Sequence, residues 1–504
     1  WGGGAAMLAA GRGRFFCTAG RGMEPFVARE VRERLGATEV HRVPGKVFFS
    51  AAAGPGELRR LRSGERLFLL VKKHSPLAVC GSKGKMLHEI KSLVVEEPKY
   101  WLDIISVWRN LRGHEREKSD VAQENLLALK RKSEEEANIA SKRQKMEQER
   151  ELVPEECQVE AGESCVVPER RNDQECPNER VTCSEDPSEE SGENHTANEE
   201  LSFSFRVSCR CSGAIARILT SQEIGRAVGV ALVQQCGWHV DLRDPDLEIF
   251  VHLNDLHSVV GIPLFRQVLP LANREYIRTA GLRSTVAWAM ASLAEITAGA
   301  FVLDPMCGLG TILLEAAKEW PEACYWGADI SDSQLEGADV NIRTAGLMDK
   351  IELLKASVKA LPLPPESFDA VISDIPFGKK FKVANDSQLL LDILPEMERV
   401  LRVGGTLVLL LSRDLRARLD GLTRCAGSDS PEPIAGGPGE MAMAKALSAD
   451  GNCAPVVDGV GEPSVGSTQR PFGSLVPDGV YGVSLGKTDA FIYRYRKISA
   501  AGHQ

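Results

Sequence analysis

The first 112 residues alternate between short apolar runs and an amphipathic stretch, a pattern typical of a small α+β unit. Strands are predicted at 15–18, 40–43, 47–50 and 67–72, and Pro44-Gly45-Lys46 supplies the turn of a hairpin. A helix is predicted over 24–35, a short one near 58–61 and a third over 91–111, where Trp101 and Trp108 share a face. The pattern indicates a ferredoxin-like βαββαβ arrangement.

Residues 113–200 are polar, with almost no aromatic side chains, and are predicted to be a disordered charged linker. Apolar periodicity returns after this linker. Strands are predicted at 201–207, 238–242 and 247–253, and a helix at 221–236. This is a second small α+β module.

From residue 273 onward, strands and helices alternate regularly, which favours a doubly wound parallel sheet of the Rossmann type. The predicted helices are 284–296, 311–320, 333–345, 387–401 and 415–422, and the predicted strands are 300–304, 325–329, 351–354, 368–374 and 406–412. A closing antiparallel hairpin is expected at 480–485 and 491–495. The Gly/Pro/Ala/Ser-rich stretch 426–474 is expected to be a flexible insertion.

The predicted organisation is therefore an N-terminal ferredoxin-like domain with the helical start of the second module (14–112), the linker (113–200), the second module (201–272) and the Rossmann-like domain (273–495). The 504 residues are 43% hydrophobic and 26% charged, an ordinary globular composition, and no apolar stretch is long enough to cross a membrane. Thirteen cysteines without any CxxC pair indicate reduced thiols inside a cell, and no metal site is expected.

The net charge of −9 argues against a nucleic-acid partner when it is taken for the whole chain. Its distribution reverses that argument. Residues 1–112 carry 20 basic and 10 acidic residues, whereas 151–200 carry 3 and 16. A basic domain beside an acidic tether is typical of nucleic-acid binding. The candidates for phosphate contacts are the arginines of two predicted helices: Arg29, Arg32, Arg34, Arg59, Arg60 and Arg62.

A glycine loop follows the first strand of the predicted parallel sheet, in the segment Asp304-Pro-Met-Cys-Gly-Leu-Gly-Thr311. Gly308 and Gly310 allow the backbone to turn sharply and to approach a ligand in the crevice at the carboxyl ends of the strands. The next strand ends at Asp329, which is placed to accept both hydroxyls of a ribose. Because neither a P-loop nor GxGxxG is present, S-adenosylmethionine fits better than ATP or NAD.

A third element, Asp374-Ile375-Pro376-Phe377-Gly378, follows the apolar strand that ends at Asp374. The exocyclic amine of a nucleobase is a poor nucleophile, because its lone pair is delocalised into the ring. The carboxylate of Asp374 and the carbonyl of Ile375 can hydrogen-bond the two amine protons and localise that electron density. Pro376 would hold this turn, and Phe377 would stack on a base removed from its helix.

These motifs resemble those of the class I S-adenosylmethionine-dependent methyltransferases that modify exocyclic amines. Phe205-Arg-Val-Ser-Cys209, Arg274-Glu-Tyr276 and Gly281-Leu-Arg-Ser-Thr-Val-Ala287 narrow the resemblance to the THUMP-domain RNA guanine-N2-methyltransferases. The resemblance implies methylation of guanine N2 in a structured RNA, with tRNA and a spliceosomal small nuclear RNA both open. It also implies a heterodimer with a small zinc-binding activator subunit shared among methyltransferases, and no membrane partner.

The catalytic residues implied by the resemblance are Asp374, Ile375, Pro376 and Phe377. The cofactor-binding residues are Asp304, Pro305, Cys307, Gly308, Gly310, Thr311, Asp329, Ser357 and Asp374. Ser357 stands where many such enzymes have an acid that contacts the adenine amine, so this contact is expected to be weak. We interpret Cys307 as a loop-packing residue and not as a nucleophile.

Three alternatives remain open at this stage: methylation of adenine N6, methylation of a protein glutamine, and a non-catalytic RNA-binding protein that keeps the fold. Lys130-Arg-Lys132 and Lys142-Arg-Gln-Lys145 resemble a two-part nuclear import signal. A nuclear location is therefore expected, with a cytoplasmic pool also open.

Overall fold

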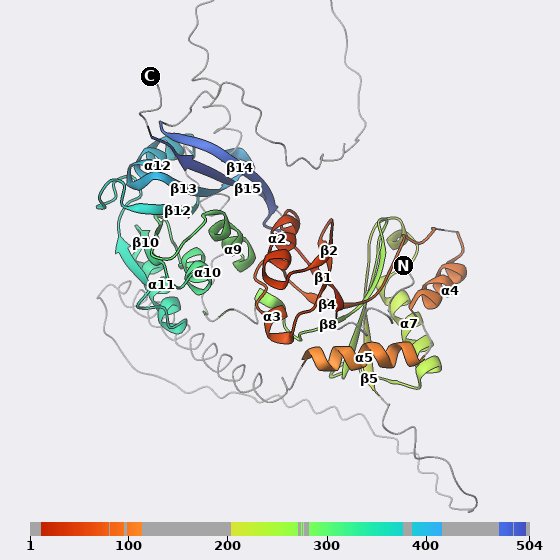
Figure 1. Ribbon diagram of the computed structural model, residues 1–504. Coiled ribbons are helices and arrows are strands. Elements are labelled where there is room, and N and C mark those ends of the chain that lie inside the picture. Colours follow the sequence, from red (N-terminus) through yellow and green to blue (C-terminus); the bar gives the residue numbers. More distant parts are fainter. Residues whose placement is uncertain are drawn as a thin grey trace, which may run out of the picture.

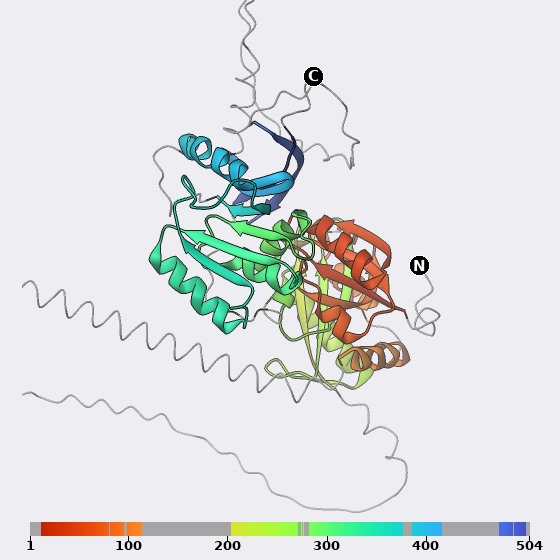
Figure 2. The ribbon, with the colours of Figure 1, turned by 60° about the vertical axis from the view of Figure 1, so that its left-hand side comes forward.

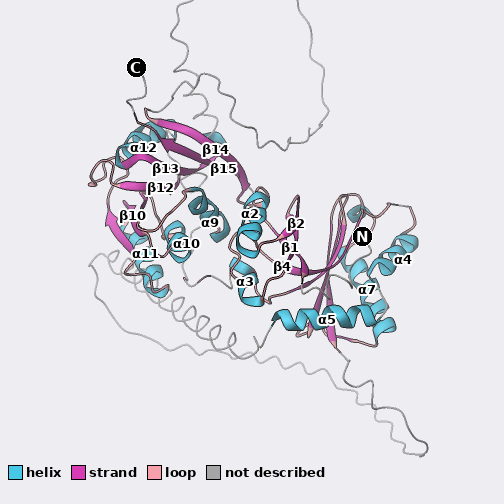
Figure 3. Ribbon diagram, viewed as in Figure 1, coloured by secondary structure: helices cyan, strands magenta, loops and turns pink. Residues whose placement is uncertain are grey.

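The computed structural model describes residues 12–79, 81–94, 98–112, 203–270, 274, 276, 282–375, 386–415, 473–486 and 488–499. It contains two sheets, both combined with helices (Figures 1 and 3). The linker 113–200, Pro376, Phe377 and nearly all of 416–474 lie outside the described residues.

The first sheet has eight strands in the order β2-β3-β1-β4-β8-β7-β5-β6. Its strands are β1 (Gly13–Thr18), β2 (Thr38–Val43), β3 (Lys46–Ala51), β4 (Leu67–His74), β5 (Ser204–Cys211), β6 (His239–Val240), β7 (Leu247–Leu253) and β8 (Ser258–Pro263). The sequence reasoning missed β8. This strand pairs antiparallel with β4, so that Phe68 lies opposite Pro263, and it joins the two predicted small modules into one sheet. We call this body, with its helices, the eight-stranded unit.

The helices of the eight-stranded unit are α2 (Glu24–Leu35), α3 (Pro55–Arg59), α4 (Lys83–Val94), α5 (Pro98–Arg112) and α7 (Ser221–Cys236), with a 3-10 turn η2 at Ile215–Arg217. The prediction of one helix over 91–111 is wrong, because α4 ends at Val94 and α5 begins at Pro98. Proline has no backbone N–H and suits the first turn of a helix, not its interior. Trp101 on α5 packs edge-on against Trp238, with ring centroids 5.9 Å apart.

The second sheet has the order β11-β10-β9-β12-β13-β15-β14. Its strands are β9 (Phe301–Asp304), β10 (Cys324–Asp329), β11 (Ile351–Lys355), β12 (Phe368–Asp374), β13 (Leu401–Ser412), β14 (Leu475–Ser484) and β15 (Asp489–Lys497). The pairings among β9 to β13 are parallel, and β15 pairs antiparallel with both β13 and β14. The predicted parallel sheet with a closing hairpin is confirmed.

The helices of this part are α9 (Ser284–Leu293), α10 (Thr311–Glu319), α11 (Asp332–Thr344) and α12 (Asp386–Val400). Side chains of α9 and α10 belong to one buried apolar cluster, whereas those of α12 belong to another. From β9 the chain adds β10 and then β11 on one side of β9, and it then crosses over to form β12 on the other side of β9. This topological switch point opens a crevice at the carboxyl ends of the strands.

Helix α2 of the eight-stranded unit packs on the second sheet and its helices (Figures 1 and 2). The Phe26 and Tyr481 rings lie 5.5 Å apart, and Ser484 N donates to Arg21 O at 2.9 Å. Arg29 donates to Ser292 Oγ at 2.7 Å, and Arg34 pairs with Glu319. These two arginines were candidates for phosphate contacts, and the structure uses them to join the two bodies instead.

No helix among the described residues is long and apolar enough to cross a lipid bilayer.

Candidate active site

The glycine loop leaves β9 and enters α10 through two residues with left-handed backbone, Gly308 (φ +52°) and Gly310 (φ +78°). Residues with a Cβ rarely adopt this conformation, so glycine is required at both turns. The loop is fixed from two sides. Gly308 N donates to Asp329 Oδ2 at 3.0 Å, and Asn341 Nδ2 donates to Leu309 O at 3.0 Å.

Asp329 ends β10 and is oriented by its neighbours, because its second oxygen accepts from Ser331 N at 2.9 Å. Its carboxylate is thereby held beside the glycine loop, where the sequence placed a ribose contact. Asn341 is fully buried and was missed by the sequence reasoning. A single polar residue in an amphipathic helix carries no signal that it will hold a loop.

Asp304 is buried at the end of β9, with 1% of its surface exposed. Its Oδ1 accepts from Met306 N and from Ser373 Oγ, both at 3.1 Å. Burial, assisted by the charges of Asp374 and Asp329, raises the pKa of Asp304 to about 8, although both hydrogen bonds oppose this. Ser373 was also missed. In the sequence, the sign that could have identified it is a hydroxyl residue that directly follows the apolar run of β12.

Asp374 ends β12, the strand next to β9, and burial raises its pKa to about 7. Its Oδ1 is buried and has no hydrogen-bond partner among the described residues. The next residue, Ile375, has a buried side chain, and its N–H donates to Leu410 O at 3.1 Å, which fixes the backbone there. A buried acceptor without a donor is costly and fits a ligand that brings an N–H group.

The other predicted site residues lie around this centre. Pro305, Cys307 and Thr311 are buried in or beside the loop, and burial raises the pKa of the Cys307 thiol, which disfavours a thiolate nucleophile. Ser357 follows β11, and its Oγ accepts from Lys359 N at 3.3 Å. Pro376 and Phe377 lie outside the described residues, and the individual roles of all these site residues stay predictions.

The site has three carboxylates at the ends of adjacent strands and a loop whose glycines admit a nucleoside. Asp304 and Asp374 are costly to ionise without a nearby cation, and the sulfonium of S-adenosylmethionine supplies one. Asp304, Asp329 and the Gly308–Gly310 loop would hold this cofactor, which brings a methyl group bound to a positively charged sulfur. Fold and site together define a class I methyltransferase.

Comparisons with known proteins agree with that class and identify a family within it. Family models match at residues 14–54 (RlmL ferredoxin-like domain), 190–262 (THUMP domain) and 272–418 (RMKL-like methyltransferase domain). The chain is 52% identical to the U6 snRNA (guanine-N(2))-methyltransferase THUMPD2 of Bos taurus, and the match covers 97% of both chains. It is 50% identical to the Homo sapiens protein of that name, again over 97% of both.

The chain therefore belongs to the THUMPD2 family of THUMP-domain guanine-N2-methyltransferases, and it is an enzyme. The crystal structure of TrmN from Thermus thermophilus has the same fold, with a TM-score of 0.56 at 18% identity, covering 96% of this chain and 99% of that one.

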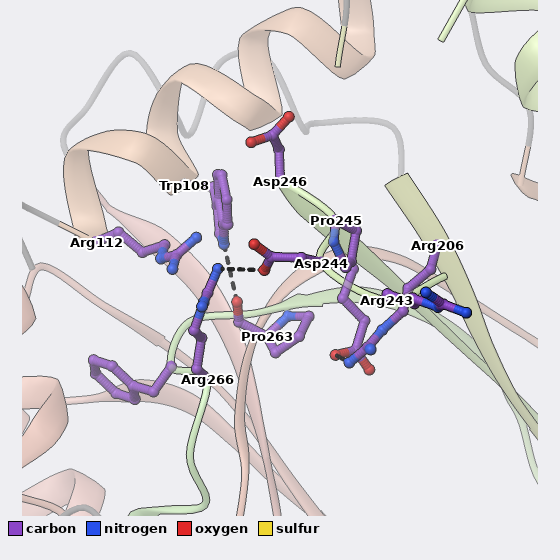
Figure 4. Close-up of a pocket in the computed structure, with 11 residues that line it drawn as sticks. Trp108, Arg112, Arg206, Arg243, Asp244, Pro245, Asp246, Pro263 and Arg266 are labelled. Atoms are coloured by element: carbon purple, nitrogen blue, oxygen red, sulfur yellow. Dashed lines mark hydrogen bonds and ion pairs between the residues drawn. The ribbon is translucent and has the colours of Figure 1, made fainter. Parts of the chain in front are cut away.

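A basic pocket of about 200 Å³ lies on the eight-stranded unit, remote in sequence from the strand-end acids (Figure 4). Trp108 donates from Nε1 to Pro263 O at 2.9 Å, and Arg266 pairs with Asp244 at 3.1 Å. Figure 4 shows the guanidinium groups of Arg112 and Arg266 turned toward the space beside Trp108. The lining residues are Trp108, Arg112, Arg206, Arg243, Asp244, Pro245, Asp246, Glu248, Pro263, Phe265 and Arg266.

We predict that Asp374→Asn weakens the pH dependence of stability in the cofactor-free protein. The pKa of Asp374 is raised from 3.8 to about 7, so its contribution to stability is present below pH 4 and is lost as the pH rises through 7. Relative to the wild type, the variant should gain stability from pH 5 to pH 8, with a slope of at most about 1.4 kcal/mol per pH unit. Urea unfolding at four pH values measures this. Parallel curves for the two proteins would contradict it.

Proposed function

We propose that this protein transfers the methyl group of S-adenosylmethionine to N2 of a guanine in U6 small nuclear RNA. The observation that carries the proposal is the buried, unpartnered Oδ1 of Asp374 at the strand end beside the glycine loop. The RNA class is supported by the THUMP-domain match and by the names of the relatives at 49–52% identity.

In this mechanism, Asp374 and the Ile375 carbonyl accept the two N–H groups of the guanine amine. These hydrogen bonds raise the electron density on nitrogen and aim its lone pair at the incoming methyl group. After transfer the nitrogen carries a positive charge and is strongly acidic. Asp374, with its pKa near 7, is suited to take the surplus proton.

The basic pocket is proposed as a contact for the RNA. Four arginines and two aromatic rings line it, together with three carboxylates, two of which pair with Arg206 and Arg266. Arginine with aromatic side chains is a combination suited to phosphates and unstacked bases. Arg206 donates from Nη2 to Glu248 at 2.9 Å, and its buried Nε has no partner among the described residues, which supports an acceptor binding there.

The small zinc-binding activator is proposed as the partner of the methyltransferase sheet. Strand β11 is an edge of that sheet and leaves one row of backbone groups unpaired. Apolar side chains are exposed close to it in the chain, with Ile330 71% and Met348 57% exposed. An edge strand with nearby exposed apolar residues suits a partner that adds a strand.

We predict that Asp374→Ala strongly lowers N2-methylguanosine formation, because only the Ile375 carbonyl is then left to accept an amine proton. Purified protein with and without the activator is incubated with labelled cofactor and either U6 RNA or tRNA, and the nucleosides are identified by mass spectrometry. The rate should fall by at least about 10²-fold in the variant.

The same assay separates the alternatives. N6-methyladenosine from the wild type, or label in protein glutamine, would replace the guanine assignment. Failure of the wild type to retain cofactor would favour a non-catalytic RNA-binding role.

We predict that Arg243→Ala and Arg266→Ala each weaken RNA binding several-fold and flatten its salt dependence, because each removes one potential phosphate contact. Binding to U6 RNA at several salt concentrations measures both effects. Arg402→Ala is the control and should bind like the wild type. Arg402 lies at the amino end of β13, outside the pocket, and pairs with Asp369. Equal salt slopes in the wild type and all three variants would exclude the pocket as an RNA contact.

We further propose a nuclear location, supported by the two basic clusters Lys130–Lys132 and Lys142–Lys145. A fluorescent fusion with both clusters changed to alanine should stay in the cytoplasm, whereas the unchanged fusion enters the nucleus. Nuclear entry of the altered fusion would refute the signal.

A further inference from the structure

Helix α10 connects the cofactor loop to the contact with the eight-stranded unit. It begins directly after Gly310 and ends at Glu319, nine residues later. Its last two turns carry two carboxylates, Glu315 and Glu319, which lie one helical turn apart. Neither reaches the reacting centre. Each is held by a residue from outside the methyltransferase sheet.

Glu319 is held from two directions. One oxygen accepts from Arg34 of α2, and the other accepts from Trp288 Nε1 of α9 at 3.3 Å. The Arg34 guanidinium also lies over the Trp288 ring, 5.8 Å from its centroid. The side chains of Arg34 and Glu319 are only 27% and 17% exposed, so this pair is shielded from the screening that weakens surface ion pairs.

Arg34 is itself fixed within the eight-stranded unit by Glu30, whose Oε1 lies 3.3 Å from Arg34 Nε. Glu30 is buried and accepts from Arg62 N and Ser63 N at 2.8 and 2.9 Å. The loop before β4, helix α2 and helix α10 are therefore linked by consecutive polar contacts.

Glu315 receives a second, independent contact. Tyr276 lies in the connection between β8 and α9, and its hydroxyl donates to Glu315 Oε1 at 2.9 Å. Both residues are buried, with 1% and 5% of their surfaces exposed. The connection and α2 thus hold the same helix at successive turns.

We propose that Arg34 and Glu319 are a positioning pair, which sets where RNA held by the eight-stranded unit meets Asp374. The proposal rests on the methyl transfer proposed above. RNA bound remotely must deliver one base to a site formed by another sheet, and a displacement of about 1 Å at the reacting atoms can cost on the order of 10²-fold in rate. The pair acts through α10, whose other end is the cofactor loop.

The test is the single-turnover rate of methyl transfer to U6 RNA by the full chain with its activator. Arg34→Met keeps an unbranched apolar side chain but removes the guanidinium group and its charge, and it should lower this rate about 10-fold or more. The dissociation constants for the RNA and for S-adenosylmethionine should each stay within about twofold of the wild type. Arg34→Lys, which keeps the charge, should recover part of the rate, and the control Arg402→Met should leave it unchanged.

Gly22→Ala disturbs the packing between the two bodies at a different point, without changing charge. Gly22 has φ +87°, and a Cβ at this position would collide with Gly482 O across the contact between the two bodies. This variant should also have a slower single-turnover rate, with unchanged dissociation constants for the RNA and for S-adenosylmethionine.

A wild-type rate in Arg34→Met, or a slow rate explained by lost RNA or cofactor affinity, would overturn the positioning role. A wild type that forms no N2-methylguanosine would instead overturn the proposed function, so the two failures are distinguishable.

Discussion

The backbone pairing of β4 with β8 is the constraint on which the rest of this protein depends. It joins the first 112 residues to the segment after the linker in one eight-stranded sheet, and helices from both segments cover that sheet. Because α2 packs on this sheet and also on the methyltransferase part, the eight-stranded unit and the methyltransferase sheet form one connected structure. One buried apolar cluster extends through both.

The active site depends on placing acids where water is scarce. Asp304 and Asp374 end adjacent strands; Asp304 is buried, and Asp374 is partly buried with its Oδ1 enclosed. This burial raises the pKa of each far above that of a free carboxyl group. Such groups gain most from a positive charge or from N–H donors, which are what a sulfonium cofactor and a base amine bring. The same burial that disfavours the ionised acids thus favours ligands that bring a positive charge or N–H donors.

The arginines of the eight-stranded unit divide between two tasks. Arg29 and Arg34 hold the two bodies together, whereas Arg112, Arg206, Arg243 and Arg266 gather around an aromatic pocket. Sequence alone does not distinguish these tasks, because an arginine on a helix looks the same whether it faces solvent, RNA or a neighbouring domain. The distinction matters for function, since loss of the first kind should impair catalysis and loss of the second kind should impair binding.

The sequence by itself determined the parallel sheet, its closing hairpin and the three acids at the strand ends. Those features follow from local periodicity and from motifs within a few residues of one another. Tertiary structure alone decided the union of the two small modules and the roles of Ser373, Asn341, Arg34 and Glu319. Each of these roles depends on a partner far away in the chain, and no local pattern encodes which distant residue will fill the other side of a hydrogen bond.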